Sequence, residues 1–175
     1  MKKFLLALPT VLFPYIPLIL VVSGVWLPVA IAIAAVMFFV TLIFTVLYYV
    51  FAFKNKWETK TLALFSMLVK LFHIPAYIML FVVGLGGMLM VKLIAVTLFV
   101  VIFDWLLMFL SGVLTLPTYI KALKGHIITG FEAIILSVFS FIFCIDILFA
   151  VVAYILISKR NGAKQIPIAV PDVNL

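Results

Sequence analysis

The feature that most constrains this 175-residue chain is a run of fifty residues, Phe4 to Phe53, without a single charged side chain. One helix needs about 20 apolar residues to cross a bilayer, so the run is long enough for two crossings. Val22-Ser23-Gly24, shortly before Pro28, predicts a tight turn between them. The run therefore predicts a helical hairpin inside a membrane.

The amino-acid composition extends this interpretation to the whole chain. Apolar residues make up 69% of the sequence and charged residues 10%, whereas a soluble domain has about 45–50% and about 25%. So few polar groups do not cover a water-exposed surface, which excludes a soluble globular domain and a disordered chain. The net charge of +7 comes from lysines scattered between apolar blocks, which excludes a nucleic-acid-binding domain. We expect an all-α integral membrane protein, folded as a compact polytopic bundle.

Apolar blocks separated by short polar or glycine-rich segments predict about five transmembrane helices, with four to six possible. Residues 1–160 would form the bundle. Residues 161–175, with two prolines and several β-branched residues, would form an extended C-terminal tail that is loose or docks on a partner. Pro117 is expected to end the fourth span. The predicted spans cover residues 4–22, 27–53, 61–83, 88–116 and 130–157.

Two of these spans have alternatives. The first contains three prolines, so residues 4–22 form either a kinked span or a re-entrant segment, and the length of the run argues against a cleaved signal peptide. The third span either covers residues 61–83 and ends in a turn at Gly84–Gly87, or is replaced by a different pair of elements. Those elements are an interfacial helix over 61–72 and a span over 74–91.

The distribution of basic residues predicts the orientation in the membrane. Cytoplasmic loops carry an excess of Lys and Arg, and most basic residues here lie at the N-terminus and after the second and fourth spans. We therefore expect a cytoplasmic N-terminus, in a plasma (inner) membrane. Five crossings leave the basic segment Lys159–Lys164 on the opposite side, and one missed or extra crossing would correct this.

Asp104 is the most informative single residue. An ionised carboxylate at the bilayer centre costs about 2.5–3.5 kcal/mol or more, so we expect it to face protein or a wet cavity. Polar residues spaced seven, seven and four apart fall within roughly 40° of one another on this helix, which predicts a polar stripe turned toward the bundle. Trp105, in the same block, is interpreted as a packing residue. The stripe consists of Thr97, Asp104, Ser111 and Thr115.

The third span offers partners for this carboxylate. Lys70 and His73 are three residues apart, so they share one helix face. At about 1.5 Å per residue, His73 and Asp104 lie at similar depth on neighbouring helices, roughly 18–20 Å from the membrane surface. We expect them to pair, either as a polar clasp between helices or as a proton- or ion-responsive site. Asp146 is a candidate second inward carboxylate, opposite Lys92 or another chain.

Two stripes of small residues predict close helix packing, within the bundle or against another subunit. Thr129 and Glu132 form a capping-box pattern, which predicts the start of the last helix at about residue 130. Cys144 is interpreted as a small buried residue. The first stripe, on the second span, contains Ala30, Ala34, Thr41, Thr45 and Ala52. The second, on the last span, contains Ala133, Ser137, Ser140 and Cys144.

The sequence contains no recognisable enzyme motif. With one cysteine, two histidines and five acidic residues, neither a metal site nor a cofactor is expected. The first hypothesis is a non-enzymatic accessory or packing subunit of a larger membrane assembly, in contact with lipid and with other subunits or copies of itself. The alternative is a small proton- or ion-linked transporter or channel that uses the His/Asp pair. The third hypothesis is a membrane-embedded lipid-modifying enzyme.

Overall fold

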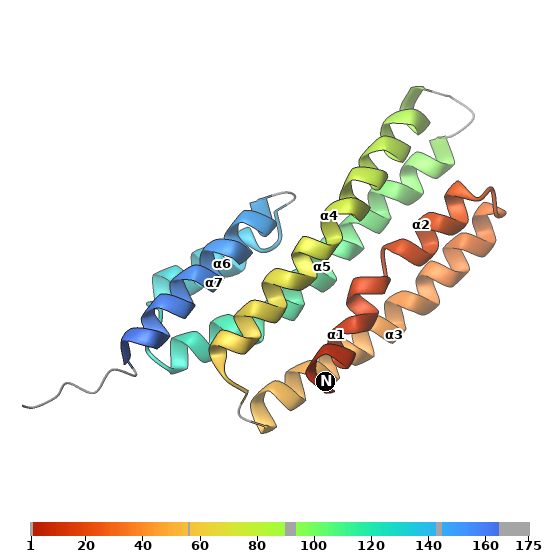
Figure 1. The fold of residues 1–175 in the computed structure, drawn as a ribbon. Coiled ribbons are helices and arrows are strands. Elements are labelled where there is room, and N and C mark those ends of the chain that lie inside the picture. The colour runs from red at the N-terminus through yellow and green to blue at the C-terminus, as the bar shows by residue number, and fades with distance from the viewer. Residues whose placement is uncertain (1, 56, 90–93, 143–144, 165–175) are drawn as a thin grey trace, which may run out of the picture.

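The computed structural model describes residues 2–55, 57–89, 94–142 and 145–164, which form helices and no strands. Figure 1 shows these helices packed side by side with their axes roughly aligned. They are α1 (Lys2–Leu12), α2 (Tyr15–Val22), α3 (Leu27–Lys54), α4 (Thr59–Leu89), α5 (Ile94–Lys124), α6 (Gly130–Phe139) and α7 (Ile145–Lys164).

Four segments of the described chain are long and apolar enough to cross a membrane. They are α1 together with α2 (Leu5–Val22), α3, α4 and α5, and α6 is a shorter apolar helix. The prediction of an all-helical polytopic membrane bundle is confirmed. The number of full-length spans lies at the lower end of the predicted range of four to six.

The first crossing packs along the small-residue stripe of α3. Pro14 has no N–H group to continue the helix, so α1 and α2 form one interrupted crossing that follows α3 (Figure 1). The hydroxyl of Thr41 points to the carbonyl of Pro9 at 3.5 Å. Small side chains on α3 let α1 and α2 approach closely. All five residues of the stripe are buried: Ala30, Ala34, Thr41, Thr45 and Ala52.

α4 is a continuous helix of 31 residues. The predicted turn at Gly84–Gly87 is therefore wrong, and so is the alternative with a separate interfacial helix. A backbone in lipid has no water to bond with, so it keeps its helical hydrogen bonds even at glycines. Gly84 also allows close contact with α5, because a β-carbon built there would lie 3.4 Å from Val100.

α5 continues through Pro117 to Lys124, so the predicted end of the fourth span at this proline is also wrong. A proline inside a helix leaves the carbonyl four residues earlier without its usual donor. That carbonyl belongs to Val113, and the hydroxyl of Tyr49 on α3 donates to it at 2.8 Å. A neighbouring helix thus satisfies the group that Pro117 frees.

The predicted last span, residues 130–157, is not a single crossing. α6 ends at Phe139, the chain turns, and α7 runs back beside α6 (Figure 1). The rings of Phe139 and Phe149 are stacked between the two helices, with 4.3 Å between their centroids. The two helices form the α6–α7 hairpin, which packs against α5 and α4. Its tip reaches Lys70 on α4, roughly 16 Å from the start of that helix.

The hairpin also corrects the predicted topology. Because α7 turns back, its basic end returns to the level of the α5–α6 connection, where Arg160 donates to the carbonyl of Ile127 at 3.1 Å. At the same level Lys121 donates to the carbonyls of Ala52, at 3.0 Å, and Trp57. The segment that begins at Lys159 therefore does not lie opposite the basic loops. We call this end of the bundle the basic end. It carries basic residues near the helix ends that meet there, Lys54, Lys60, Lys121, Lys124, Lys159 and Arg160.

Candidate functional site

A buried ion pair between Lys70 and Asp146 joins α4 to the tip of the hairpin. The Nζ atom of Lys70 lies 3.1 Å from Oδ2 of Asp146, and the two side chains are 0% and 1% exposed. The same Nζ donates to the carbonyl of Ser140 at 3.1 Å. Ser140 follows the last residue of α6, where helix carbonyls lack partners, and Asp146 lies in the first turn of α7. One ammonium group therefore donates both to a carbonyl at the end of α6 and to the carboxylate in the first turn of α7.

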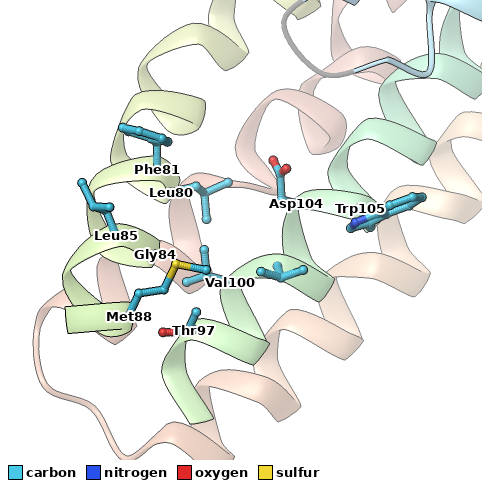
Figure 2. Close-up of a pocket in the computed structure, with 10 residues that line it drawn as sticks. Leu80, Phe81, Gly84, Leu85, Met88, Thr97, Val100, Asp104 and Trp105 are labelled. Atoms are coloured by element: carbon cyan, nitrogen blue, oxygen red, sulfur yellow. The ribbon is translucent and has the colours of Figure 1, made fainter. Parts of the chain in front are cut away.

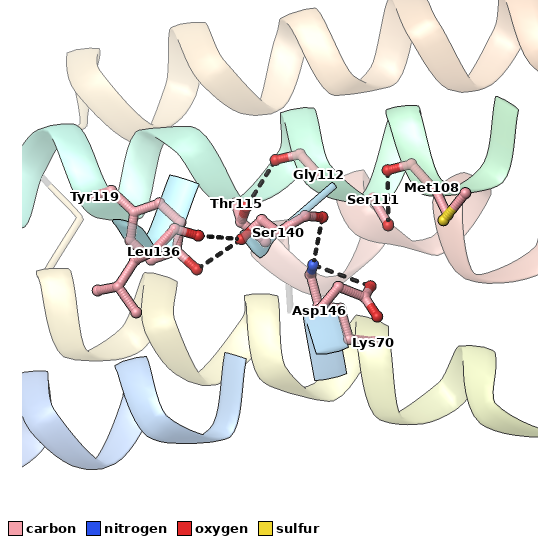
Figure 3. A network of polar contacts seen from close by, with 9 residues as sticks. All are labelled: Lys70, Met108, Ser111, Gly112, Thr115, Tyr119, Leu136, Ser140 and Asp146. Atoms are coloured by element: carbon pink, nitrogen blue, oxygen red, sulfur yellow. Dashed lines mark hydrogen bonds and ion pairs between the residues drawn. The ribbon is translucent and has the colours of Figure 1, made fainter. Parts of the chain in front are cut away.

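Neutral hydrogen bonds surround this ion pair (Figure 3). The hydroxyls of Tyr119 and Ser140 are 3.0 Å apart, and that of Ser140 donates to the carbonyl of Leu136 at 2.8 Å. Ser111 and Thr115, both members of the predicted polar stripe, are buried and donate to carbonyls of their own helix. These hydroxyl groups thus bond within the protein's own fold, whereas Oδ1 of Asp146 is buried without a hydrogen-bond partner among the described residues.

His73 has a structural partner on the first crossing. Its side chain is fully buried, and Nε2 lies 2.9 Å from the carbonyl oxygen of Thr10. Thr10 is four residues before Pro14, so the proline leaves this carbonyl without a helical donor. With its proton on Nε2, the imidazole supplies the missing hydrogen bond.

The predicted pair of His73 and Asp104 does not form. The hydroxyls of Ser66 and Thr118 are 3.0 Å apart and fix the register of α4 against α5. In this register Asp104 lies opposite position 80 of α4, seven residues or roughly 10 Å beyond His73. The depth comparison failed because α5 continues past Pro117, which lies inside the bundle rather than at its surface.

Asp104 lies instead in a groove between α4 and α5, beyond the tip of the hairpin (Figure 2). The groove has a volume of about 230 Å³. Its walls are apolar except for Thr97 and Asp104, and Oδ1 of Asp104 is buried without a hydrogen-bond partner among the described residues. Trp105 is 70% exposed at the edge of the groove, so its interpretation as a packing residue is wrong. The groove is lined by residues of both helices, among them Leu80, Gly84, Leu85, Met88, Thr97 and Val101.

A second ion pair closes the hairpin at the basic end. Glu132 accepts two hydrogen bonds from Arg160, at 2.7 and 2.8 Å, and one from the N–H of Thr129 at 2.8 Å. The hydroxyl of Thr129 accepts from the N–H of Glu132, which completes the predicted capping box. The Arg160 guanidinium and the Thr129 N–H lower the pKa of Glu132 from 4.5 to about 2. This pair is partly exposed, unlike the pair at the hairpin tip.

The structure thus separates the four intramembrane candidates into three environments. Lys70 and Asp146 pair with each other, and His73 bonds to a backbone carbonyl. Asp104 lies in the groove, where its Oδ1 has no hydrogen-bond partner within the described ranges. Sequence reasoning placed Asp146 opposite Lys92 or another chain and missed its pairing with Lys70. Lys92 itself lies outside the described residues.

The predicted packing stripe of the last block is divided by the hairpin turn. Ala133 and Ser140 are buried, Ser137 is partly exposed, and Cys144 lies outside the described residues. The roles of Arg160 and Tyr119 were not predicted. A signal for Arg160 was present, because a capping-box glutamate at a basic membrane surface is a natural partner for a nearby arginine.

Comparisons of the chain with protein-family models, with curated proteins and with solved structures find no match. The function must therefore be inferred from the arrangement of the side chains. The two features that require an explanation are the buried ion pair at the hairpin tip and the groove carboxylate, whose Oδ1 has no hydrogen-bond partner in the part of the chain that the structure describes.

Proposed function

We propose that this protein is a non-enzymatic accessory subunit of a larger membrane assembly and that it binds its partner within the bilayer. The observation that carries the proposal is the uneven cover of α4 and α5. The α6–α7 hairpin covers these helices up to the level of Lys70, and beyond it they form a groove that contains Asp104. Lipid covers apolar side chains well but does not satisfy a carboxylate, so this face is better suited to protein than to lipid.

The use of the other polar groups supports this proposal. Lys70 and Asp146 hold the hairpin, and Nε2 of His73 is bonded to the carbonyl of Thr10. These contacts favour the interpretation of the polar residues as clasps between helices. They leave His73 poorly placed for acid–base chemistry with Asp104, which argues against the lipid-modifying enzyme.

The same proposal includes an orientation. Basic residues gather at the end of the bundle that also holds the start of α1. The positive-inside rule then favours a cytoplasmic basic end and a cytoplasmic N-terminus, in a plasma (inner) membrane. Accessibility of cysteines introduced at Lys60 and Lys124 to an impermeant thiol reagent tests this, and labelling from outside intact cells would contradict it.

The subunit proposal is tested by native mass spectrometry of the full chain, extracted from its own membranes in mild detergent or lipid nanodiscs. We expect a complex of fixed stoichiometry that contains at least one other membrane protein. A monomer that carries lipid alone, under conditions in which a known complex from the same membranes stays intact, would contradict the proposal.

A small proton- or ion-linked transporter remains the second candidate function. It is favoured by the proximity of Lys70, Asp146 and Asp104, because the carboxylates of Asp104 and Asp146 lie near enough to interact electrostatically. Its test is proton flux into proteoliposomes loaded with a pH-sensitive dye. Flux that is lost in Asp104→Asn would support transport, and wild-type vesicles no leakier than empty ones would reject it.

A further inference from the structure

Among the residues that the structure describes, the charges inside the bundle do not balance. Lys70 and Asp146 neutralise each other at 3.1 Å, which leaves Asp104 as an additional acid near the same pair. Oδ1 of Asp104 is buried without a hydrogen-bond partner among the described residues. The exposed apolar side chains around Asp104 suit a lipid-facing surface, whereas its carboxylate does not. An occupant of the groove that supplies a cation would remove this imbalance.

The shape of the groove favours a helix as that occupant. Its α4 wall follows Leu80, Gly84 and Met88, and its α5 wall follows Thr97, Val101 and Trp105, each spaced four residues apart. The groove therefore runs along the helix axes for roughly 12 Å, like the grooves into which the ridges of a packed helix fit. Gly84 has no side chain, which allows another helix to come close.

The size of the groove argues against a small amphiphilic ligand. Its volume of about 230 Å³ is below the roughly 300–1,000 Å³ of typical small-molecule pockets. A space of this size suits a few side chains of a helix that lies across its opening. Trp105, which is 70% exposed beside Asp104, offers such a helix an aromatic contact.

A second copy of this chain does not fit the charge. In a two-fold symmetric dimer through this face, the same patch meets itself, so each Asp104 would approach the other. Two carboxylates at one site in lipid repel each other. The occupant must therefore carry the opposite charge at this depth.

We propose that the groove between α4 and α5 binds one transmembrane helix of a partner protein and that this helix carries a Lys or Arg at the depth of Asp104. The inference rests on the proposed subunit function and names the surface and the chemistry of the contact. Asp104 and the basic residue of the partner would form an ion pair within the bilayer, and Leu80, Gly84 and Met88 would pack against the rest of the partner helix.

The test is photo-crosslinking of the full chain in its native membranes. A benzophenone amino acid replaces Leu85, which lines the groove, or Val36, which is 63% exposed on α3 and lies outside it. Mass spectrometry identifies the crosslinked peptide. We expect Leu85 to capture a transmembrane segment with a Lys or Arg near its centre, and Asp104→Asn to reduce the yield at least fivefold. Ser111→Ala, a buried change outside the groove, is the matched control and should not reduce it.

A charge exchange completes the test. Asp104→Lys should abolish the crosslink, and replacing the basic residue of the captured segment with Asp should restore it in the Asp104→Lys chain. The inference fails if Leu85 captures only lipid, a second copy of this chain, or a segment without a basic residue. It also fails if the crosslinking yield does not depend on Asp104. A partner captured at Val36 but not at Leu85 would agree with the subunit function but would contradict the proposal that the groove binds the partner. Capture at neither position would contradict both.

Discussion

Two carboxylates lie against different halves of the α4–α5 pair, and only one of them has a counter-charge nearby in the part of the chain that the structure describes. Near the hairpin tip, Asp146 has an ammonium group 3.1 Å away and the cover of two helices. Beyond the tip, Asp104 lies in an open groove, and its Oδ1 has no partner in the described chain. Oδ1 of Asp146 also lacks a hydrogen-bond partner among the described residues, so the difference between the two halves lies in the counter-charge. The described chain supplies it to Asp146, whereas under our proposal a partner helix supplies it to Asp104.

The strongest test of the half that the hairpin covers is Lys70→Met. Removal of the ammonium leaves Asp146 buried and the carbonyl of Ser140 without its donor, so we expect a loss of about 3–5 kcal/mol of stability. The measurement is reversible unfolding of the purified protein in detergent or bicelles. The double variant Lys70→Met/Asp146→Leu should recover most of the loss, since it removes both charges. A loss in the double variant as large as in the single one would show that the pair does not hold the hairpin.

A smaller effect is expected at the first crossing, where His73→Phe leaves the carbonyl of Thr10 buried and unpaired. We expect a loss of about 1–3 kcal/mol. Pro14→Ala provides a matched test, because Pro14 already has helical dihedral angles and alanine would return an N–H to Thr10. In the Pro14→Ala background His73→Phe should therefore be much less destabilising. Equal losses of stability in both backgrounds would show that His73 does not compensate for the N–H group that Pro14 lacks.

The comparison itself is tested by the same substitution at both carboxylates. Asp146→Asn removes the counter-charge of Lys70 and should destabilise clearly, whereas Asp104→Asn in the isolated chain should change stability by less than about 1 kcal/mol or increase it. Thermal unfolding of the two purified variants in the same detergent measures the difference. If Asp104→Asn is as destabilising as Asp146→Asn, the groove is not an open half of the bundle.

The smallest effect is expected at the basic end, where an ion pair is exposed to water. The pKa of Glu132 is lowered to about 2, so its contribution to stability is complete above its ordinary value of 4.5. That contribution is lost as pH falls from 4.5 through 2, when the carboxylate is protonated. The protection factors of the amides in the first turn of α6, which correct the exchange rate for its intrinsic pH dependence, should fall over this interval in the wild type and should not change with pH in Glu132→Gln. Wild-type protection factors that do not change with pH would contradict the role of the pair.

Much of the fold follows from the sequence because lipid imposes simple rules. The uncharged run from Phe4 to Phe53 requires membrane helices, and the small-residue stripe of α3 is buried along its length. The Thr129–Glu132 capping box marks the start of α6. Each of these signals is local, since it depends on composition or on residues within a few turns of one another.

The features that sequence reasoning missed depend on distant contacts or on the solvent. Gly84 and Pro117 end helices in water but not here, where the bilayer keeps the backbone bonded and Tyr49 supplies a donor. The break after Phe139 has no proline or glycine to mark it, and Lys70 bonds to the carbonyl that the break exposes. His73 was assigned to a carboxylate, although the carbonyl freed by Pro14 was an equally good acceptor.

The pairing of Lys70 with the hairpin also has a consequence during translation. The two partners are separated by 76 residues, so at about 5–20 residues per second the ribosome makes Asp146 roughly 4–15 s after Lys70. During that interval the nascent chain holds a lysine in α4 whose counter-charge does not yet exist. The α6–α7 hairpin therefore supplies the counter-charge of a helix that the ribosome made well before it.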